Sequence, residues 1–396
     1  MNELQGEDYD FNRLFGGSIM SPVPPPYGVL ARLRAERPVL RMKGWMESSH
    51  LVTRYDDVVA ALKDSETFSS RANARGIGIV IGRTILEMEG AEHRRQRRIL
   101  TPFFAPRTLR EDVEPYVEAT AQELIDQFAR DGGADLVSQF TFTYPLRIIA
   151  HMIGVPIADF EAFHHWAQDL VAVADDPAKG FAAAHSIVDY LRPIVERRRA
   201  EPRDDLLTAL LTAEVEGERL SEEEVLSFLR LLLPAGAETT YRLSGNVLYA
   251  LLTHPEARAQ VEADRGLIPA LIEETLRWDS PVQLASRELT RDVELHGYRI
   301  PKGDLAALAL GSANHDESRF ADPERFDLQR DNKNEHVSFG LGEHFCLGAN
   351  LARMETRVAV TAMLDRLPNL RLDPAATCSV VGFAFRSPDR LPVLFG

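Results

Sequence analysis

The sequence predicts a mainly α-helical protein with small β-sheets, and three observations lead to this fold class. Between about residues 112 and 220, apolar residues recur at the spacing of helix faces. A long helical stretch then runs on to about Thr253, where His254 and Pro255 end it. Strand-like runs are short, and the clearest is a glycine-marked hairpin at residues 292–303.

The N-terminal part combines short helices with a small sheet. Residues 27–36 are predicted to form a short helix, and residues 39–40 and 50–53 to form strands. The next helix begins at Tyr55, with Asp56 as its candidate N-cap because a short acidic side chain can accept from the first free backbone N–H groups.

Two segments with opposite character follow. Residues 71–90 form an apolar run that glycines interrupt, and composition alone fits either a buried loop or an edge strand. Residues 92–100 are strongly charged, and His93 and Arg97 stand four apart, so on a helix they share one face. A charged helix segment of this kind is most often simply solvated.

The middle of the chain is a series of helices. They are predicted at residues 114–129, 145–153, 158–172, 179–200 and 204–214. Aromatic and histidine side chains gather between about 155 and 190, and such a stripe is more often core than a cofactor site. The adjacent pair His164 and His165 lacks a third ligand, so it is a weak metal site.

The long helix before Thr253 has an unusual interior. Ser221 and Glu224 form a capping box at its start. Further on, Pro234 removes a backbone hydrogen bond, Gly236 weakens the helix, and the polar pair that follows at 238–239 lies among leucines. Such local conflicts are expected at functional sites, although a tolerated kink with an exposed glutamate is the alternative interpretation.

One of only two cysteines, Cys346, lies in the glycine-rich stretch 339–348. The glycines at 340, 342 and 348 are expected to take positive φ and to let the backbone approach a flat group. A good helix follows, and the positive end of its dipole would favour a thiolate at Cys346. Nucleophile, metal ligand and inert buried thiol all remain open at this point.

Bulk composition limits the functional classes. The chain of 396 residues has a formal net charge of −15, which argues against nucleic acid as a partner. Two cysteines give no disulfide framework, and the acidic N-terminus has neither a signal peptide pattern nor a membrane span. A cytoplasmic location is therefore expected. Length alone would allow more than one domain.

Residues 339–348 resemble the Phe-x-x-Gly-x-His-x-Cys-x-Gly signature of the cytochrome P450 family at every position. Four more of its motifs follow the family order: His-x-x-x-Arg at 93–97, the acid–Thr–Thr motif at 235–240, Glu-x-x-Arg at 274–277, and the meander at 314–326. The resemblance covers nearly the whole chain. It implies one domain, residues 1–396, shaped as a triangular prism, with haem between the long central helix and the Cys-loop helix. Its β-rich part would be about 27–70, and its helical bulk about 90–280 and 345–366.

The resemblance also assigns roles to residues. Cys346 would be the axial ligand of the iron in haem b, as in the haem-thiolate enzymes. Glu238 and Thr239 would carry out proton relay and oxygen binding, and Glu274 and Arg277 would form a structural pair. The other haem contacts would be His93, Arg97, Ala235, Arg287, Phe339, Gly340, His344 and Gly348. The substrate pocket would contain Ile79, Val80, Ile85, Leu232, Leu284, Ala285 and Phe383, and the redox-partner face would carry Arg94, Arg95 and Arg98, all three turned outward.

The implied function is that of a bacterial monooxygenase without a membrane anchor. It would use O₂ to hydroxylate or epoxidise a lipophilic molecule such as a terpenoid, steroid, fatty acid or polyketide. Electrons would come from a separate ferredoxin and its reductase, and the enzyme would be a monomer. The alternatives are a peroxide-driven peroxygenase, whose members usually lose the acid–Thr pair retained here, and a non-catalytic haem-binding sensor.

Overall fold

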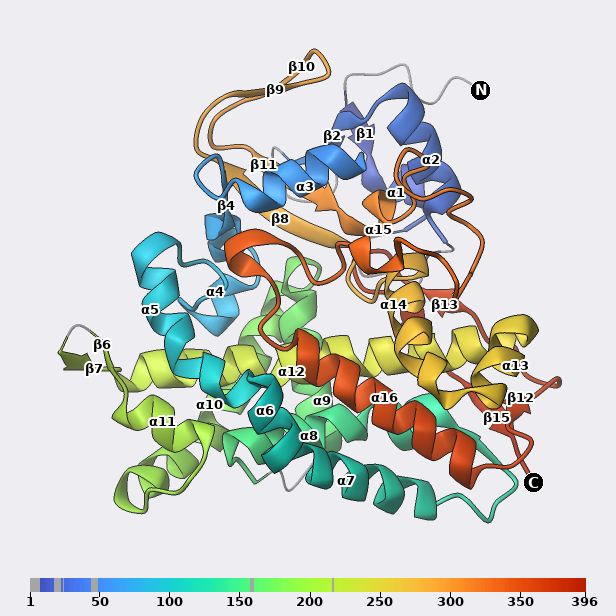
Figure 1. Ribbon diagram of the computed structural model, residues 1–396. Coiled ribbons are helices and arrows are strands. Elements are labelled where there is room, and N and C mark those ends of the chain that lie inside the picture. Colours follow the sequence, from blue (N-terminus) through green and yellow to red (C-terminus); the bar gives the residue numbers. More distant parts are fainter. Residues whose placement is uncertain (1–7, 18–22, 24, 44–48, 157–159, 216) are drawn as a thin grey trace. The chain divides into compact units, whose positions relative to one another are not determined.

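The computed structural model describes residues 8–17, 23, 25–43, 49–156, 160–215 and 217–396 (Figure 1). Its contacts divide the chain into two compact units. Unit 1 comprises Met1–Ala72, Gly245–Cys346 and Pro374–Leu391, and unit 2 comprises Asn73–Ser244, Leu347–Asp373 and Pro392–Gly396. The expectation of a single domain stays a prediction. None of the helices in the described ranges is long and apolar enough to span a bilayer.

Unit 1 is built on a six-stranded sheet with strand order β1-β2-β3-β11-β8-β4. The strands are β1 Asp8–Asp10, β2 Val39–Lys43, β3 Ser49–Val52, β11 Leu305–Ala309, β8 Leu284–Leu289 and β4 Phe68–Ser69. Every residue of β11 is buried. Ala307 and Ala309 belong to one hydrophobic cluster and Ala306 and Leu308 to another, as expected when successive side chains point to opposite faces. The sheet therefore has apolar side chains packed on both faces.

Two helices of unit 1, α2 Tyr27–Glu36 and α3 Tyr55–Lys63, confirm the helices predicted in the N-terminal part. The other helices of this unit are α1 Phe11–Phe15, α13 Pro255–Ala263, α14 Ile268–Trp278 and α15 Leu310–Ala313. The predicted hairpin is present as β9 Val293–Leu295 and β10 Tyr298–Ile300, and a second pairs β13 Val380–Val381 with β14 Ser387–Pro388.

The predicted cap of α3 is wrong. The backbone N–H of Tyr55 donates to the carboxylate of Asp316 at 2.8 Å, and Asp56 makes no capping bond. Asp316 is also the acceptor for Ser318, both from its N–H at 2.9 Å and from its hydroxyl at 2.7 Å. A carboxylate held in this way by its own turn is already oriented, so it caps a helix far away in the sequence.

Unit 2 is mainly helical. It contains α4 Gly78–Ile81, α5 Gly90–Leu100, α6 Pro106–Thr108, α7 Glu114–Asp126, α8 Thr143–Ile153, α9 Phe160–Val171, α10 Pro177–Ala200, α11 Leu206–Thr212 and α16 Ala349–Arg366. The long α12 Glu222–Thr253 begins in this unit. Its strands are β5 Gly133–Asp135, β12 Arg371–Leu372 and β15 Pro392–Leu394 in one sheet, and β6 Glu214–Val215 with β7 Glu218–Arg219. All five helices predicted between 114 and 214 are confirmed, and their ends differ from the predicted ones by at most three residues. The predicted start at residue 158 lies outside the described residues.

The segment 71–90 is a loop with short helical turns, so the edge-strand alternative is wrong. It contains a 3₁₀ turn, Ser70–Arg75, and the four-residue α4. A Cβ at Gly78 would lie 2.7 Å from the backbone oxygen of Asn73, and Gly82 has φ +82°. Glycine tolerates the close backbone contact at position 78 and the positive φ at position 82, so the chain can turn tightly here instead of extending as a strand.

Candidate active site

The loop that carries Cys346 is fixed by its own backbone. Gly340 and Gly342 have φ of 67° and 71°, a conformation that favours glycine. A Cβ at Gly342 would also lie 2.7 Å from the backbone oxygen of Leu62, so this glycine lets the loop meet the end of α3. The N–H of Cys346 donates to the carbonyl oxygen of Phe339 at 2.9 Å and closes the loop.

Cys346 itself is exposed, as is its neighbour Phe345. The helix α16 begins at Ala349, as predicted. Gly348 precedes it with φ −83°, so the expectation of a positive φ at Gly348 is wrong. The reason is local: Gly348 is the N-cap of α16, and its carbonyl accepts the first helical hydrogen bond, from the N–H of Ala352 at 2.9 Å.

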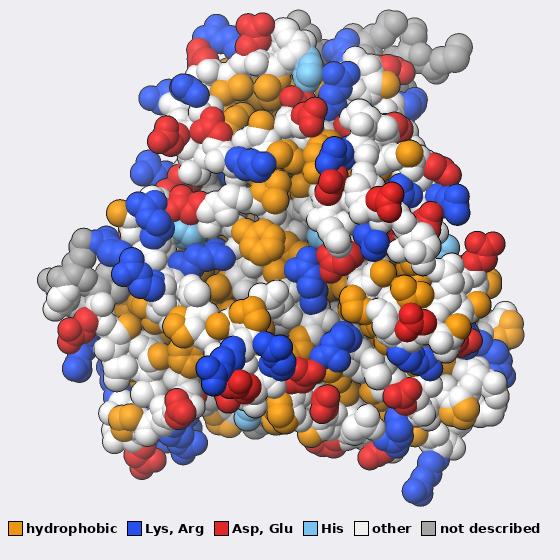
Figure 2. Space-filling model, in the orientation of Figure 1, with side chains coloured by type: hydrophobic (Ala, Val, Ile, Leu, Met, Phe, Trp, Pro, Cys, Tyr) orange, Lys and Arg blue, Asp and Glu red, His pale blue; other side chains and the backbone are white. Residues whose placement is uncertain are grey.

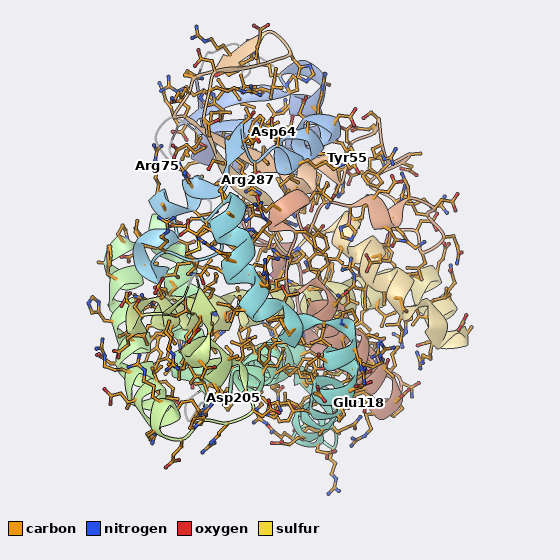
Figure 3. The ribbon with its side chains drawn as sticks, turned by 60° about the vertical axis from the view of Figure 1, so that its left-hand side comes forward. Tyr55, Asp64, Arg75, Glu118, Asp205 and Arg287 are labelled. Carbon is orange, nitrogen blue, oxygen red and sulfur yellow. The ribbon has the colours of Figure 1, made fainter. Side chains whose placement is uncertain are left out.

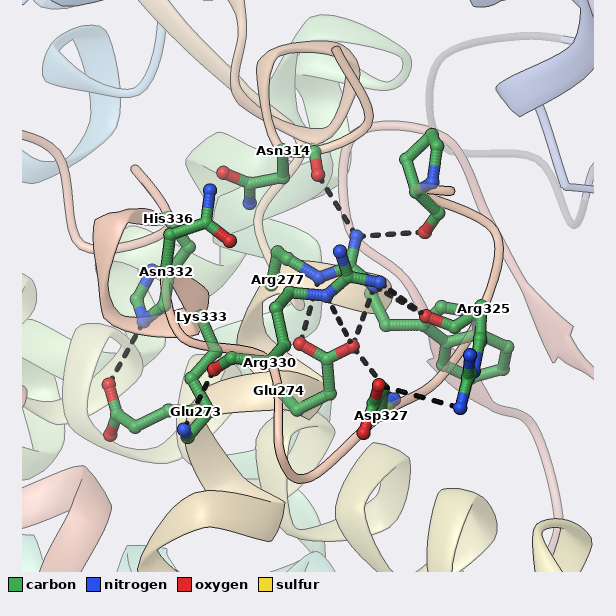
Figure 4. A network of polar contacts seen from close by, with 12 residues as sticks. Glu273, Glu274, Arg277, Asn314, Arg325, Asp327, Arg330, Asn332, Lys333 and His336 are labelled. Carbon is green, nitrogen blue, oxygen red and sulfur yellow. Dashed lines mark hydrogen bonds and ion pairs between the residues drawn. The ribbon is translucent and has the colours of Figure 1, made fainter. Parts of the chain in front are cut away.

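A buried ion network supports the segment that leads to this loop (Figure 4). Arg277 and Glu274 are fully buried and joined by two hydrogen bonds, of 2.8 and 2.9 Å. The remaining N–H groups of Arg277 donate to the backbone oxygens of Asn314, Pro323 and Arg325. Arg330, from the segment before the Cys loop, joins the pair with its Nε 3.2 Å from Oε1 of Glu274.

The carbonyl contacts of this network were not predictable from the Glu-x-x-Arg pattern, and neither was the role of Asn314. The side chain of Asn314 donates to Ser338 at 2.9 Å and accepts from the N–H of Val337 at 2.8 Å. Ser338 in turn donates to the backbone oxygen of Leu276 on α14. Together these bonds fasten the residues just before Phe339 to the helix that carries Arg277.

Unit 1 also contains four other residues expected at the site. Arg287 lies on β8 and is largely buried. It belongs to the same unit as Tyr55 and Asp64 of the α3 region, which are labelled with it in Figure 3. Leu284 and Ala285 are half-buried on the same strand. Phe383 is almost fully buried and packs against Phe15, with ring centroids 4.3 Å apart, in a core cluster of unit 1. Their roles toward haem and substrate stay predictions.

In unit 2, α5 carries His93 and Arg97 as predicted. His93 is buried and Arg97 is half-buried, one helical turn apart. Arg94 and Arg98 are exposed, and Lys and Arg side chains gather over α5 and α6 in Figure 2. The expectation that Arg95 also faces outward is wrong, because it is half-buried and its Nε is covered. The helix α11 packs against α5.

The expected pocket residues of unit 2 differ in exposure. Val80 and Ile85 of the loop before α5 are buried, whereas Ile79 is 44% exposed. On α12, Leu232 is buried and Ala235 is exposed. These positions stay candidates for contacts with substrate and haem.

The helix α12 keeps its predicted capping box but shows no break at its proline. Ser221 N–H donates to Glu224 at 2.7 Å, and the N–H of Glu224 donates back to the Ser221 hydroxyl at 3.3 Å. The helix is continuous from Glu222 to Thr253 with Pro234 inside it. Gly236 has a reason in tertiary structure, since a Cβ there would lie 2.8 Å from Cγ1 of Ile149 on α8.

The acid–Thr pair of α12 has two different environments. The hydroxyl of Thr239 donates to the backbone oxygen of Ala235 at 2.7 Å, the usual bond of a helical threonine to its preceding turn. The side chain of Glu238 is only 2% exposed, so the interpretation as an exposed glutamate beside a kink is wrong. Its carboxylate lies 3.2 Å from Nδ1 of His164 and 3.6 Å from Nη2 of Arg242. No sequence motif had linked His164 to this site.

These residues suit a thiolate-bound haem. A cysteine sulfur exposed on a rigid loop is a soft ligand for iron. Arg287, His93, Arg97 and His344 are donors of the kind that a propionate carboxylate requires.

Comparison with known proteins decides the family. The family described as Cytochrome P450 matches residues 23–154 and 174–368. The chain belongs to the cytochrome P450 family. It is 36% identical over 388 residues to Cytochrome P450 107B1 of Saccharopolyspora erythraea, covering 92% of this chain and 93% of that one. It is 38% identical over 331 residues to the Cyclomarin C epoxidase CymV of Salinispora arenicola, covering 81% and 83%.

Solved structures confirm the cytochrome P450 fold. The crystal structure of P450BioI in complex with an acyl carrier protein ligated to hexadec-9Z-enoic acid is similar with a TM-score of 0.84 and 33% identity. The match covers 94% of this chain and 98% of that chain. As a cytochrome P450, the protein has haem b as its cofactor and is a monooxygenase. Enzymes of this family use O₂, take electrons from redox partners and act on lipophilic molecules.

Proposed function

We propose that this cytochrome P450 inserts one oxygen atom from O₂ into a C–H or C=C bond of a lipophilic molecule, with Cys346 as the axial ligand of its haem iron. The observation that carries the proposal is the Phe339–Cys346 loop, whose backbone is closed by a hydrogen bond and whose cysteine is exposed. The second oxygen atom leaves as water, which takes up two protons and two electrons.

The remaining haem contacts follow from the chemistry of the groups. Arg287, His93, Arg97 and His344 would bind the two propionates by charge-assisted hydrogen bonds. Ala235, Phe339, Gly340 and Gly348 are proposed as the apolar and backbone contacts of the ring. Bound haem b supplies the activation of O₂ and the transfer of the oxygen atom.

The protein's own contribution to the reaction is the control of protons and water. Thr239 would hold a hydrogen bond at the oxygen-binding position, for which its hydroxyl must leave the backbone oxygen of Ala235. Glu238 would supply protons, because it is a buried carboxylate next to Thr239 with ionisable groups beside it. This retained pair favours an O₂-dependent monooxygenase over a peroxygenase or a sensor.

For the substrate we propose a polyketide, a fatty acyl chain or a molecule of similar polarity. The candidate pocket positions Ile79, Val80, Ile85, Leu232, Leu284, Ala285 and Phe383 are all apolar. One relative is an epoxidase of cyclomarin C, and P450BioI binds a fatty acyl chain carried by a protein. Terpenoids and steroids, which are also lipophilic, should be tested as substrates beside them. Electrons are proposed to come from a ferredoxin that docks on the face with the exposed Arg94 and Arg98.

The first experiment is the absorption spectrum of the reduced protein with carbon monoxide. A strongly red-shifted Soret band is expected for the native protein and should be lost in Cys346→His, while Cys378→Ser retains it. A band typical of histidine or thiol ligation in fresh native protein would contradict the proposal. Turnover with O₂, NADPH and a surrogate ferredoxin system, compared with turnover on peroxide alone, then separates monooxygenase from peroxygenase and sensor.

A further inference from the structure

Glu238 has two charged or ionisable neighbours that lie on different helices. His164 belongs to α9, with its Nδ1 3.2 Å from Oε1 of Glu238. Arg242 lies one turn further along α12, with its Nη2 3.6 Å from Oε2. Within the described residues, no group donates a well-aligned hydrogen bond to Oε1. The carboxylate therefore lacks a well-aligned hydrogen bond at one of its two oxygens.

The two neighbours differ in what they can do for a carboxylate. A guanidinium has donors and no acceptor, so Arg242 can supply only charge and hydrogen bonds. An imidazole has one nitrogen that can donate and one that can accept, so it can both hold a carboxylate and exchange a proton with it. His164 is thus the neighbour of Glu238 that is suited to proton transfer.

His164 also lines a cavity of about 600 Å³ between α7, α8 and α9. A cavity of this volume with polar walls can hold ordered water. Its polar lining includes Gln127, Arg147, Glu161, His165 and Gln168. Arg147 is paired with Glu123 at 2.8 Å, and His165 bonds through Nδ1 to the backbone oxygen of Glu161 at 2.8 Å. His164 therefore lines a cavity with both polar and apolar walls and also contacts the buried carboxylate of Glu238.

Aromatic rings hold the imidazole in this position. Phe142 lies against it with ring centroids 4.1 Å apart, and Tyr241 meets it edge-on at 5.7 Å. Nε2 of His164 is covered by protein atoms in this arrangement. The ring must therefore turn toward the cavity to pick up a proton, and then return to Glu238.

We propose that His164 is a positioning residue for Glu238 and carries protons to it from this cavity. The proposal rests on the proposed role of Glu238 in the reaction. In the step itself, the N–H bond at Nδ1 of the imidazolium breaks, an O–H bond forms on Glu238, and the imidazole becomes neutral. Glu238 passes this proton on to the reaction, and the imidazole takes its next proton from bulk solvent through water in the cavity, so no hydroxide is left and no group is oxidised or reduced.

The test is His164→Gln, compared with His165→Gln as the matched control on the same helix and cavity. Glutamine keeps a hydrogen-bonding side chain but cannot transfer a proton. We expect His164→Gln to lower product formed per NADPH by about 10-fold or more and to raise the solvent deuterium effect on turnover. The carbon monoxide band and substrate affinity should stay unchanged, and His165→Gln should behave as the native enzyme does. Added imidazole is unsuitable for rescue because it would ligate the haem iron.

A second readout does not depend on turnover. Denaturant unfolding of the native protein, His164→Gln, Glu238→Gln and the double variant should give strongly non-additive stabilities, since residues in contact couple. Additive stabilities would overturn the proposal, and so would a His164→Gln enzyme that forms as much product per NADPH as His165→Gln does. If Glu238→Gln also keeps the native yield of product per NADPH, the role proposed for Glu238 fails as well. If this yield falls only in Glu238→Gln, that role stands and the inference about His164 is wrong. Should His164→Gln not bind haem, His164→Asn provides the same comparison.

Discussion

Two buried glutamates in this protein have opposite surroundings. Glu274 accepts two hydrogen bonds from Arg277, one from Arg330 and one from the N–H of Asp327. Glu238 has His164 and Arg242 beside it, and its Oε1 receives no well-aligned bond from the described residues. The bonds of Glu274 occupy both of its oxygens and fix the carboxylate in place. The looser partners of Glu238 leave an oxygen available for a new donor, which is what a relay requires.

The largest expected effect comes from making the same change at both glutamates. Glu274→Gln leaves Arg277 and Arg330 buried without a counter-charge, so we expect it to lower the free energy of unfolding by about 3–5 kcal/mol. Glu238→Gln should lower it by no more than about 1 kcal/mol, because no saturated set of bonds is lost. Denaturant unfolding measures both values, and product per NADPH should fall only in correctly folded Glu238→Gln.

The control for this pair is Glu273→Gln, next to Glu274 in the sequence. Glu273 meets His336 at 3.1 Å, and a histidine can become neutral when its partner is lost. Glu273→Gln should therefore lower the free energy of unfolding much less than Glu274→Gln does. If Glu274→Gln and Glu238→Gln lowered the free energy of unfolding equally, the number of hydrogen bonds to a buried glutamate would not distinguish a structural glutamate from a functional one.

A second prediction concerns the helix that carries Glu238. Gly236→Ala would place a Cβ 2.8 Å from Cγ1 of Ile149 and 3.1 Å from its Cβ and Cδ1. Alanine gains about 1 kcal/mol of helix propensity, but overlap in a packed core costs about 1–3 kcal/mol, so a net loss of stability is expected. In the double variant with Ile149→Ala the overlap is relieved, and the loss should be smaller than the sum of the two single losses.

The matched control is Gly245→Ala on the same helix. A Cβ at Gly245 would make an ordinary contact of 3.5 Å with Pro388. This change should be neutral or stabilising, because only the gain in helix propensity remains. If Gly236→Ala is equally well tolerated, close approach of α8 is not the reason for this glycine, and the placement of Glu238 does not depend on it.

The distance between interacting residues along the chain explains which features could be predicted from the sequence. The Cys loop, the capping box at Ser221 and the pairing of Glu274 with Arg277 depend on residues that are close in the sequence, and all three are confirmed. The cap of α3 by Asp316 and the contact of His164 with Glu238 join residues far apart in the chain. No local pattern marks such partners, because the fold alone brings them together.

A third buried glutamate tests the comparison through pH. Glu355 on α16 is buried, its Oε2 has no hydrogen-bond partner among the described residues, and burial raises the pKa of its carboxyl well above the ordinary value of 4.5. The native state therefore keeps this proton to higher pH than the unfolded state does. Stability must then fall as pH rises above about 4.5, with a slope of at most about 1.4 kcal/mol per pH unit, until the carboxyl ionises in the native state.

Glu355→Gln removes this slope, because an amide carries no proton to lose. The variant should gain stability relative to the native protein as pH rises from about 4.5, while Asp365→Asn, exposed on the same helix, should show no such gain. Urea unfolding across this pH range measures the difference. A constant difference at all pH values would mean that Glu355 is ionised and paired in solution, which would place it with Glu274. A stability gain of Glu355→Gln that grows with pH would instead show that Glu355 stays neutral in the native state. Glu355 would then differ both from Glu274, whose oxygens are fully hydrogen-bonded, and from Glu238, whose partners are loose.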